Sequence, residues 1–383
     1  MKRKSAMIKK GICIMICLCF CMPMDTGKAV ELGLSARSAC MMDVDSGQVL
    51  FCKNEREKRP MASTTKIMTA ILALESGKLD NVVTIPIKAT QMEGTKIYLK
   101  TGEKMYLRDL VTGLMLDSGN DAAYSIACFL GKDEAKFAQM MTKKAKKIGA
   151  LDTVFKNPHG LPEKGHYTTA YDLALITAYA MKNPEFVRIS SLKSASASTC
   201  LDERTVYFRN HNKLLSLYDN AVGVKTGYTK EAGRCLVGAA QTNGLCVVTV
   251  TLNAPDDWND HIKMFQYAFD HYEKQQVIKK GTFLKTIKVI NGESEYARLF
   301  SAKDLLVTVA KGEQVKTYLR YNVPKSIKAP IIKGQKIGSI DAYVGNIKAG
   351  STPIVSKAGI NYVEKETFLK YFGAILKNWL RVS

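Results

Sequence analysis

The segment MASTTKIMTAILALESG, residues 61 to 77, places the strongest constraint on the fold of this chain. Apolar residues occur on nearly every side of the helix that the segment predicts, as in a helix buried within a large core. Lys66 nevertheless opens the apolar run, three residues after Ser63. A chain of 383 residues is long enough to bury such a helix in one of several domains.

The first 29 residues have the pattern of a secretory signal peptide. The basic stretch KRKSAMIKK, the apolar run GICIMICLCFCM and the small-residue site GKA follow one another. The apolar run is short for a membrane span, and an uncleaved anchor is the alternative. We therefore expect an exported protein whose mature chain begins near Val30. Removing six basic residues and one acidic residue reduces the net charge from +21 to about +16.

The charge and the cysteines limit the possible partners. A strongly basic surface suits anionic membranes or cell walls, and no nucleic-acid-binding motif is found. Six of the ten cysteines lie beyond the signal peptide, without C-x-x-C spacing, and the five histidines form no metal-binding pair. Export permits disulfides, but apolar neighbours favour buried free thiols. The sequence thus implies neither a metal nor a cofactor.

The pattern of elements predicts an α/β catalytic domain over residues 30–275. We expect a hairpin around the Asp-Ser-Gly turn of ACMMDVDSGQVLFCKN, and helices at 63–76, 133–148, 168–181 and 258–273. Thr169 and Asp172 are spaced like a capping pair at the third of these helices. Strands are expected in AVGVKTGY, CLVGAAQ and LCVVTVTL, the last two joined by a Thr-Asn-Gly turn.

The character of the sequence changes near residue 275. Residues 276–362 contain short β-type runs punctuated by Gly and Pro, which predict a small all-β domain. Residues 363–383 return to helical period, with one apolar face and basic residues beside it; the face is formed by Phe368, Phe372, Ile375, Leu376 and Trp379. We expect this amphipathic helix to lie in a membrane interface; docking on its own domain is the alternative.

The Ser63–Lys66 pair suggests a nucleophile and its base. Residues three apart on a helix share a face, so the hydroxyl and the amine can meet. Serine attacks a carbonyl only when another group removes its proton. Lysine can do so if burial lowers its pKa, and a buried helix provides that environment. A capping serine and a snorkelling lysine would be the structural alternative.

Two further motifs strengthen the catalytic interpretation. DSGND supplies Ser118 as a proton shuttle and Asn120 as a clamp for a substrate amide, on a turn beside an apolar helix. GVKTGYT supplies Lys225, Thr226 and Gly227 at the end of an apolar strand, where an extended substrate can pair and a carboxylate can bind. The copies SSLK and LKTG elsewhere lack the buried helix and the strand context that this chemistry needs.

Together these motifs resemble the signature set of penicillin-binding proteins and serine β-lactamases. MDVDSGQVLFCKNEREKRPMASTTKIMTA, GLMLDSGNDAA, FKNPHGLPEKGHYTTAYDLALI and VGVKTGYTKEAGRCLVGAA resemble one branch, the low-molecular-mass D-alanyl-D-alanine carboxypeptidases of serine peptidase family S11. The resemblance spans about residues 36 to 273. It implies a catalytic domain of the β-lactamase and penicillin-binding-protein type, followed by the β-rich domain and the terminal amphipathic helix.

The resemblance also implies roles for individual residues. Ser63 would attack the terminal D-Ala-D-Ala bond of a peptidoglycan stem peptide, with Lys66 as base and Ser118 and Lys225 passing protons to the leaving amine. The backbone N–H groups of Ser63 and Tyr228 would form the oxyanion hole. Substrate contacts would come from Asn120, Lys225, Thr226 and Gly227, and Arg209 or Arg234 would assist carboxylate recognition. β-Lactams would be covalent inhibitors, and the terminal helix would hold the enzyme at the outer face of the cell membrane.

Three alternatives remain at this point. A class A β-lactamase would use a deacylating glutamate, usually in an E-x-x-L-N motif, and no such motif occurs between Asn120 and Lys225. A transpeptidase would share every motif, and an inactive wall-binding module would be a different class altogether. His159 in NPHG suggests a Ser-His-Asp triad, but we expect a structured loop there, because Lys66 is already available as the base. No G-x-S-x-G elbow supports an α/β-hydrolase.

Overall fold

The computed structural model describes residues 31–200, 204–364 and Lys377. Its catalytic region is built on a five-stranded antiparallel sheet in the order β2-β1-β9-β8-β7. These strands are β1 (Ser38–Asp43), β2 (Val49–Lys53), β7 (Ala221–Thr229), β8 (Gly233–Thr242) and β9 (Leu245–Leu252). The predicted hairpin at the N-terminal end and the Thr-Asn-Gly turn between β8 and β9 are confirmed.

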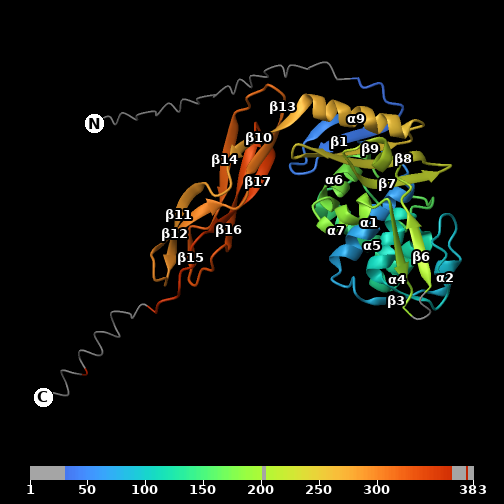
Figure 1. Ribbon diagram of the computed structural model, residues 1–383, viewed down its shortest axis with the longest axis horizontal. Coiled ribbons are helices and arrows are strands. Elements are labelled where there is room, and N and C mark those ends of the chain that lie inside the picture. Colours follow the sequence, from blue (N-terminus) through green and yellow to red (C-terminus); the bar gives the residue numbers. More distant parts are fainter. Residues whose placement is uncertain (1–30, 201–203, 365–376, 378–383) are drawn as a thin grey trace, which may run out of the picture. The chain divides into compact units, whose positions relative to one another are not determined.

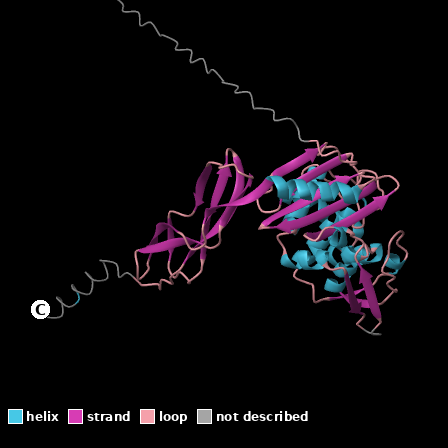
Figure 2. Ribbon diagram, turned by 45° about the horizontal axis from the view of Figure 1, so that its top comes forward, coloured by secondary structure: helices cyan, strands magenta, loops and turns pink. Residues whose placement is uncertain are grey.

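Helices cover both faces of this sheet (Figures 1 and 2). One face packs against α9 (Asp257–His271), and the other against α6 (Ala170–Ala180), which in turn contacts the buried α1 (Lys66–Glu75). Around α1 lie the remaining long helices, α3 (Leu107–Leu116), α4 (Asn120–Gly131), α5 (Glu134–Ile148) and α7 (Pro184–Ser191). The sheet and helices share one hydrophobic core, in which Ile67, Met68 and Ala70 of α1 are completely buried.

Capping side chains mark the start of some of the helices. Asp133 caps α5 by accepting from the Lys136 N–H, and Thr169 caps α6 by accepting from the Asp172 N–H at 3.0 Å, as the sequence predicts. Shorter elements complete the domain; they are η1 (Ala62–Thr65), α2 (Ile87–Thr90), α8 (Leu214–Leu217) and the strand pairs β3 (Val82–Thr84) with β4 (Lys104–Tyr106) and β5 (Ser194–Ser198) with β6 (Thr205–Arg209). The β5–β6 hairpin is a finding that the sequence analysis did not anticipate.

The C-terminal domain is all β over the described residues, as predicted. The chain leaves α9 directly into a strand at Tyr272. A two-stranded sheet, β10-β13, and a six-stranded sheet, β14-β16-β17-β12-β11-β15, enclose a separate core. The strands are β10 (Tyr272–Ile278), β11 (Phe283–Ile290), β12 (Tyr296–Ser301), β13 (Leu305–Ala310), β14 (Thr317–Asn322), β15 (Ser326–Lys328), β16 (Lys336–Val344) and β17 (Ile347–Ser356).

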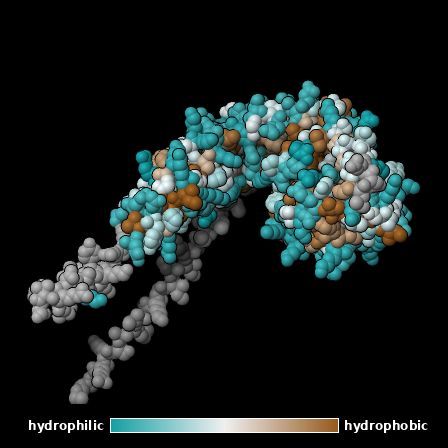
Figure 3. Space-filling view, turned by 60° about the horizontal axis from the view of Figure 1, so that its bottom comes forward, coloured by the Kyte–Doolittle hydropathy of each residue, from teal (hydrophilic) through white to brown (hydrophobic). Residues whose placement is uncertain are grey.

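Hydrophilic residues cover most of the visible surface, with smaller hydrophobic patches among them (Figure 3). The six cysteines of the described chain are free, but only Cys40 and Cys235 are buried, fewer than the sequence led us to expect. No helix in the described ranges is both long and apolar enough to cross a membrane. The signal peptide and the amphipathic helix predicted at 363–383 lie outside the described residues, apart from a few positions at the helix start and Lys377.

Candidate active site

Ser63 lies on a tight turn that leads into the buried helix. The sequence predicts one helix from residue 63, whereas the structure has the 3₁₀ turn η1 first and the α-helix only from Lys66. The tighter turn has fewer residues per turn, so side chains three apart lie almost directly above one another. Lys66 Nζ is 2.9 Å from Ser63 Oγ as a result.

Lys66 has a complete set of hydrogen-bond partners although it is fully buried. Besides Ser63, its Nζ donates to Asn120 Oδ1 and to the backbone oxygen of His159, each at 2.7 Å. Those two oxygens can only accept. In a neutral amine they take both N–H hydrogens, and the remaining lone pair then faces the Ser63 hydroxyl. The arrangement is therefore that of a general base next to a nucleophile.

The electrostatic surroundings favour the neutral form of this amine. Burial lowers the pKa of Lys66 well below its ordinary range, and the neighbouring Lys225 cation lowers it further, while Asp121 opposes both. Burial also lowers the pKa of Lys225, to about 7, against the opposing charge of Asp117. The burial that the sequence predicts for Lys66 is thus confirmed.

These pKa shifts predict the pH dependence of acylation. The base acts only when neutral, so the rate of Ser63 acylation by penicillin falls as the pH drops through the lowered pKa of Lys66. Because this pKa lies well below that of an ordinary lysine, we expect the plateau to begin far below pH 10. Stopped-flow acylation from pH 5 to pH 10 measures it. An acid limb centred near the pKa of an exposed lysine would contradict the prediction.

The Ser-Gly-Asn turn brings two more predicted residues to the site. Ser118 connects α3 to α4 with a positive φ of 62° and is 5% exposed. Asn120 is the first residue of α4; its Oδ1 accepts from Lys66, and its Nδ2 donates to the Glu93 carbonyl at 2.5 Å. Both ends of the Asn120 amide are thus hydrogen-bonded within the protein. Its contact with Lys66 is therefore better supported than the predicted contact with a substrate amide.

The end of β7 closes the site from the other side. Lys225 is 1% exposed, and its Nζ donates to the Thr226 carbonyl at 3.2 Å. A Cβ built on Gly227 would come within 2.9 Å of Ser63 N, so the strand can approach Ser63 this closely only because residue 227 is glycine. The exposed Tyr228 follows at the rim.

Five of the predicted site residues line a cleft of about 290 Å³, namely Ser63, Ser118, Thr226, Gly227 and Tyr228, whereas Lys66, Asn120 and Lys225 lie behind its surface. A larger cavity of about 610 Å³ lies between α5 and the 154–163 loop and does not contain Ser63. The reactive cleft also has lining residues that the sequence analysis did not identify as functional: Thr95, His211, Asp257 and Trp258. No local motif marked them, because they come from separate segments.

The structure distinguishes the two candidate arginines. Arg234 lines the cleft, while Arg209 lies on β6 beside Asp117 and is absent from the cleft lining. Arg234 Nη2 is 2.6 Å from Asp257 Oδ1, and its guanidinium carbon is 5.6 Å from the Trp258 ring centre. Its side chain remains 42% exposed, so the guanidinium can still reach a ligand.

A serine beside a buried lysine, a Ser-x-Asn turn and a Lys-Thr-Gly strand form the motif set of serine acyl-transfer enzymes of the penicillin-binding type. Comparison with known proteins identifies the family. The D-alanyl-D-alanine carboxypeptidase family matches residues 25–256, and the C-terminal domain of penicillin-binding protein 5 matches residues 272–362. The chain belongs to the D-alanyl-D-alanine carboxypeptidases of serine peptidase family S11, as the sequence motifs indicate.

The chain is also similar to individual proteins of known name or structure. The D-alanyl-D-alanine carboxypeptidase DacF of Bacillus subtilis is 32% identical over 355 residues, which cover 90% of this chain and 91% of the relative. Penicillin-binding protein 5 of Haemophilus influenzae gives a TM-score of 0.64 at 28% identity, covering 86% of this chain and 98% of that one. A mutant of the DD-transpeptidase of Streptomyces K15 gives 0.60 at 34% identity, covering 62% and 98%. The protein is therefore a serine-type D-Ala-D-Ala carboxypeptidase.

Proposed function

We propose that this carboxypeptidase removes the terminal D-alanine of peptidoglycan stem pentapeptides through an acyl-enzyme on Ser63. The observation that carries the proposal is the geometry of Lys66, buried and 2.9 Å from Ser63 Oγ. Lys66 takes the hydroxyl proton as Ser63 attacks the penultimate D-Ala carbonyl. The peptide bond then breaks, and Ser118 and Lys225 deliver a proton to the departing D-alanine amine. Water hydrolyses the ester and regenerates the serine.

The oxyanion that forms in each step needs preorganised donors. We assign them to the backbone N–H groups of Ser63 and Tyr228, because β7 passes so close to Ser63 that Gly227 cannot carry a Cβ. Thr226 and Arg234, which border the cleft, would hold the substrate's terminal carboxylate. The free end of a stem peptide carries such a carboxylate, and penicillin carries a similar one.

Mass spectrometry of the mature protein after incubation with penicillin tests the assignment of Ser63. We expect a long-lived adduct on Ser63, no adduct on a Ser63→Ala variant, and release of D-alanine from diacetyl-Lys-D-Ala-D-Ala by the wild type only. Rapid loss of the adduct with penicillin turnover and no D-alanine would favour a β-lactamase. Transfer of the acyl group to an added amino acid in preference to water would favour a transpeptidase.

Removing the Arg234 guanidinium should weaken carboxylate recognition specifically. An Arg234→Leu variant loses a charge-assisted bond worth about 1.5–3 kcal/mol, so we expect KM for the free-acid peptide to rise about 10- to 100-fold. The C-terminal amide of the same peptide offers no carboxylate and serves as the matched control. Steady-state kinetics with both substrates test this prediction. An equal loss of activity on the acid and the amide would mean that Arg234 only supports Asp257 and the fold.

We also propose that the protein acts outside the cytoplasm, attached to the outer face of the cell membrane. The basic, apolar and small-residue order of the first 29 residues and the amphipathic pattern of 363–383 support this location. Deleting residues 363–383 should then release the protein into the soluble fraction after cell breakage. The signal peptide must be shown to be cleaved in the same sample, and unchanged membrane sedimentation would contradict the proposed anchor.

A further inference from the structure

The second acceptor of the catalytic base is a backbone carbonyl, that of His159, and its position depends on the loop that contains it. Residues 154–168 run between α5 and α6 and lie against η1 and α1 at three points. The His159 oxygen accepts from Lys66 at 2.7 Å, the Pro158 oxygen accepts from Thr69 Oγ1 at 2.6 Å, and His166 Nε2 is 2.8 Å from Thr65 Oγ1. The loop therefore lies along one side of η1 and the first turn of α1.

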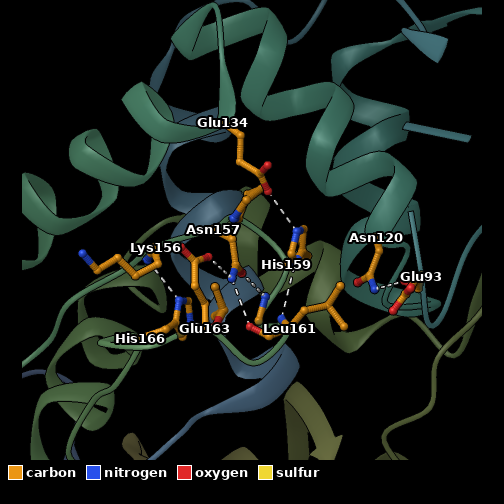
Figure 4. A network of polar contacts seen from close by, with 12 residues as sticks. Glu93, Asn120, Glu134, Lys156, Asn157, His159, Leu161, Glu163 and His166 are labelled. Carbon is orange, nitrogen blue, oxygen red and sulfur yellow. Dashed lines mark hydrogen bonds and ion pairs between the residues drawn. The ribbon is translucent and has the colours of Figure 1, made fainter. Parts of the chain in front are cut away.

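Inside the loop, the Asn157 side chain stabilises the bend of the backbone through hydrogen bonds (Figure 4). Asn157 Oδ1 accepts from the Gly160 N–H at 2.8 Å, and its Nδ2 donates to the Leu161 carbonyl and to Glu163 Oε2 at 3.0 and 3.1 Å. This clamp fixes the curvature of the loop. It does not fix the position of the loop relative to the rest of the domain.

The His159 ring connects the loop to α5. Its Nδ1 accepts from the Leu161 N–H at 3.2 Å, so the neutral ring carries its hydrogen on Nε2, which faces Glu134 Oε1 at 2.9 Å. Figure 4 shows Glu134 reaching from α5 to this ring. The ring is 5% exposed and the glutamate 25%, so the pair is largely shielded from solvent. Neither residue lines the cleft that contains Ser63.

We propose that Glu134 and His159 are positioning residues for the catalytic base: their hydrogen bond holds the His159 carbonyl where it orients the Lys66 amine toward Ser63. The pair ties the loop to the first turn of α5, the carbonyl binds one hydrogen of the amine, and Asn120 binds the other. If the tie is cut, the amine can rotate and its lone pair no longer faces the hydroxyl. The inference rests on Lys66 as the base and goes beyond it by assigning two residues outside the cleft.

The charges around the pair give the inference a distinctive pH signature. His159 is faced by Glu134 from α5, Lys66 from α1 and Glu163 from its own loop, and burial keeps its pKa below the ordinary value, so the ring is neutral at pH 7. Lys66 is faced in addition by Lys225 and Asp121. An acceptor carbonyl stabilises an ammonium more than an amine, so displacing it lowers the pKa of Lys66 further. The acid limb of acylation then moves to lower pH while the plateau rate falls.

Four variants of the full mature chain test separately the Glu134 acceptor, the His159 donor and the His159 acceptor. Glu134→Ala removes the acceptor, whereas Glu134→Gln keeps an oxygen that can accept from Nε2–H. His159→Gln keeps a donor for Glu134 and loses the acceptor for Leu161, and His159→Asn does the reverse. Glu185→Gln is the matched control, because Glu185 also lies in the first turn of a helix and pairs with the exposed Arg188.

The readouts are the rate of acylation by penicillin, kcat and KM for D-alanine release, the pH profile and the unfolding temperature. We expect Glu134→Ala and His159→Asn to lower acylation and kcat about 10- to 100-fold, as small misplacements of reacting groups do, with KM changed less than about twofold. Glu134→Gln should stay within about threefold of the wild type, and the acid limb should move to lower pH in Glu134→Ala.

Two results would overturn the inference. One is wild-type acylation and an unmoved acid limb in Glu134→Ala and His159→Asn. The other is an equal rate loss at every pH that follows the unfolding temperature, which would make the pair a support of the fold alone. Failure of the wild-type protein to form a Ser63 adduct would count against the proposed function instead, so the two failures can be told apart.

Discussion

A Lys66→Arg variant is expected to lose about 10²- to 10⁴-fold in the rate of Ser63 acylation, the range that general-base catalysis contributes. The substitution keeps a positive charge and a long side chain. Arginine, however, stays protonated at every accessible pH, so it cannot remove the serine proton. In the structure the Lys66 amine is fully buried, so no solvent stabilises its charged form, and its Nζ lies 2.9 Å from Ser63 Oγ. We expect the loss at all pH values, without an alkaline recovery.

The measurement is formation of the penicillin adduct, followed by mass, in the variant and in a Lys144→Arg control. Lys144 is also paired to a helix residue, but through a salt bridge to Glu75 away from the cleft. Both proteins should show the circular dichroism of the wild type. A folded Lys66→Arg protein that acylates at the wild-type rate would remove Lys66 from the mechanism and return the search for a base to Lys225.

A Gly160→Ala variant should lose most activity and a measurable part of its stability. Gly160 has a φ of +90°, and a Cβ there would overlap the Ala62 carbonyl, which belongs to the backbone and cannot turn aside. The left-handed conformation alone costs a non-glycine residue about 1–3 kcal/mol. The loop must also move away from the Ser63 turn, taking the His159 carbonyl with it. We expect acylation to fall about 100-fold, as a displacement near 1 Å can cause.

Gly165→Ala provides the matched control for this prediction. Gly165 lies in the same loop with a φ of +85°, but a Cβ there meets only the flexible end of Lys156, at 3.2 Å. Thermal unfolding should show a loss of stability in both variants, from the shared conformational cost. Only Gly160→Ala should lose acylation. Equal activities in the two would mean that contact between this loop and Ala62 has no influence on the nucleophile.

Many elements of the fold could be predicted from the sequence, because their turn and capping residues favour the same conformation as the tertiary packing. The Asp-Ser-Gly hairpin, the capped α6 helix and the Thr-Asn-Gly turn all carry turn or capping residues at the positions that the structure requires. The apolar run after Lys66 correctly indicated burial. The β5–β6 hairpin was missed because SASAS has small polar residues and half-exposed alternation, a weak strand signal.

Only part of the site could be predicted from the sequence, because only some of its residues lie in short motifs. Ser63, Lys66, Ser118 and the Lys-Thr-Gly strand are marked by short motifs, and the structure brings them together. His211, Asp257 and Trp258 join the cleft through long-range packing that no local pattern records. The same holds for the His159 carbonyl: a motif can indicate a loop, but not which backbone oxygen of that loop will face the base.

The order of strands in the main sheet determines when the enzyme can form during synthesis. β1, near the beginning of the chain, has β9 as its inner neighbour, so the sheet stays incomplete until residues up to Leu252 are available. Pairing across such a separation is slow, because the chain entropy is lost before the contacts form. The nucleophile and the Lys-Thr-Gly strand are separated by most of this interval. An elongating chain thus lacks a complete site until β7 and β9 have been added to the sheet.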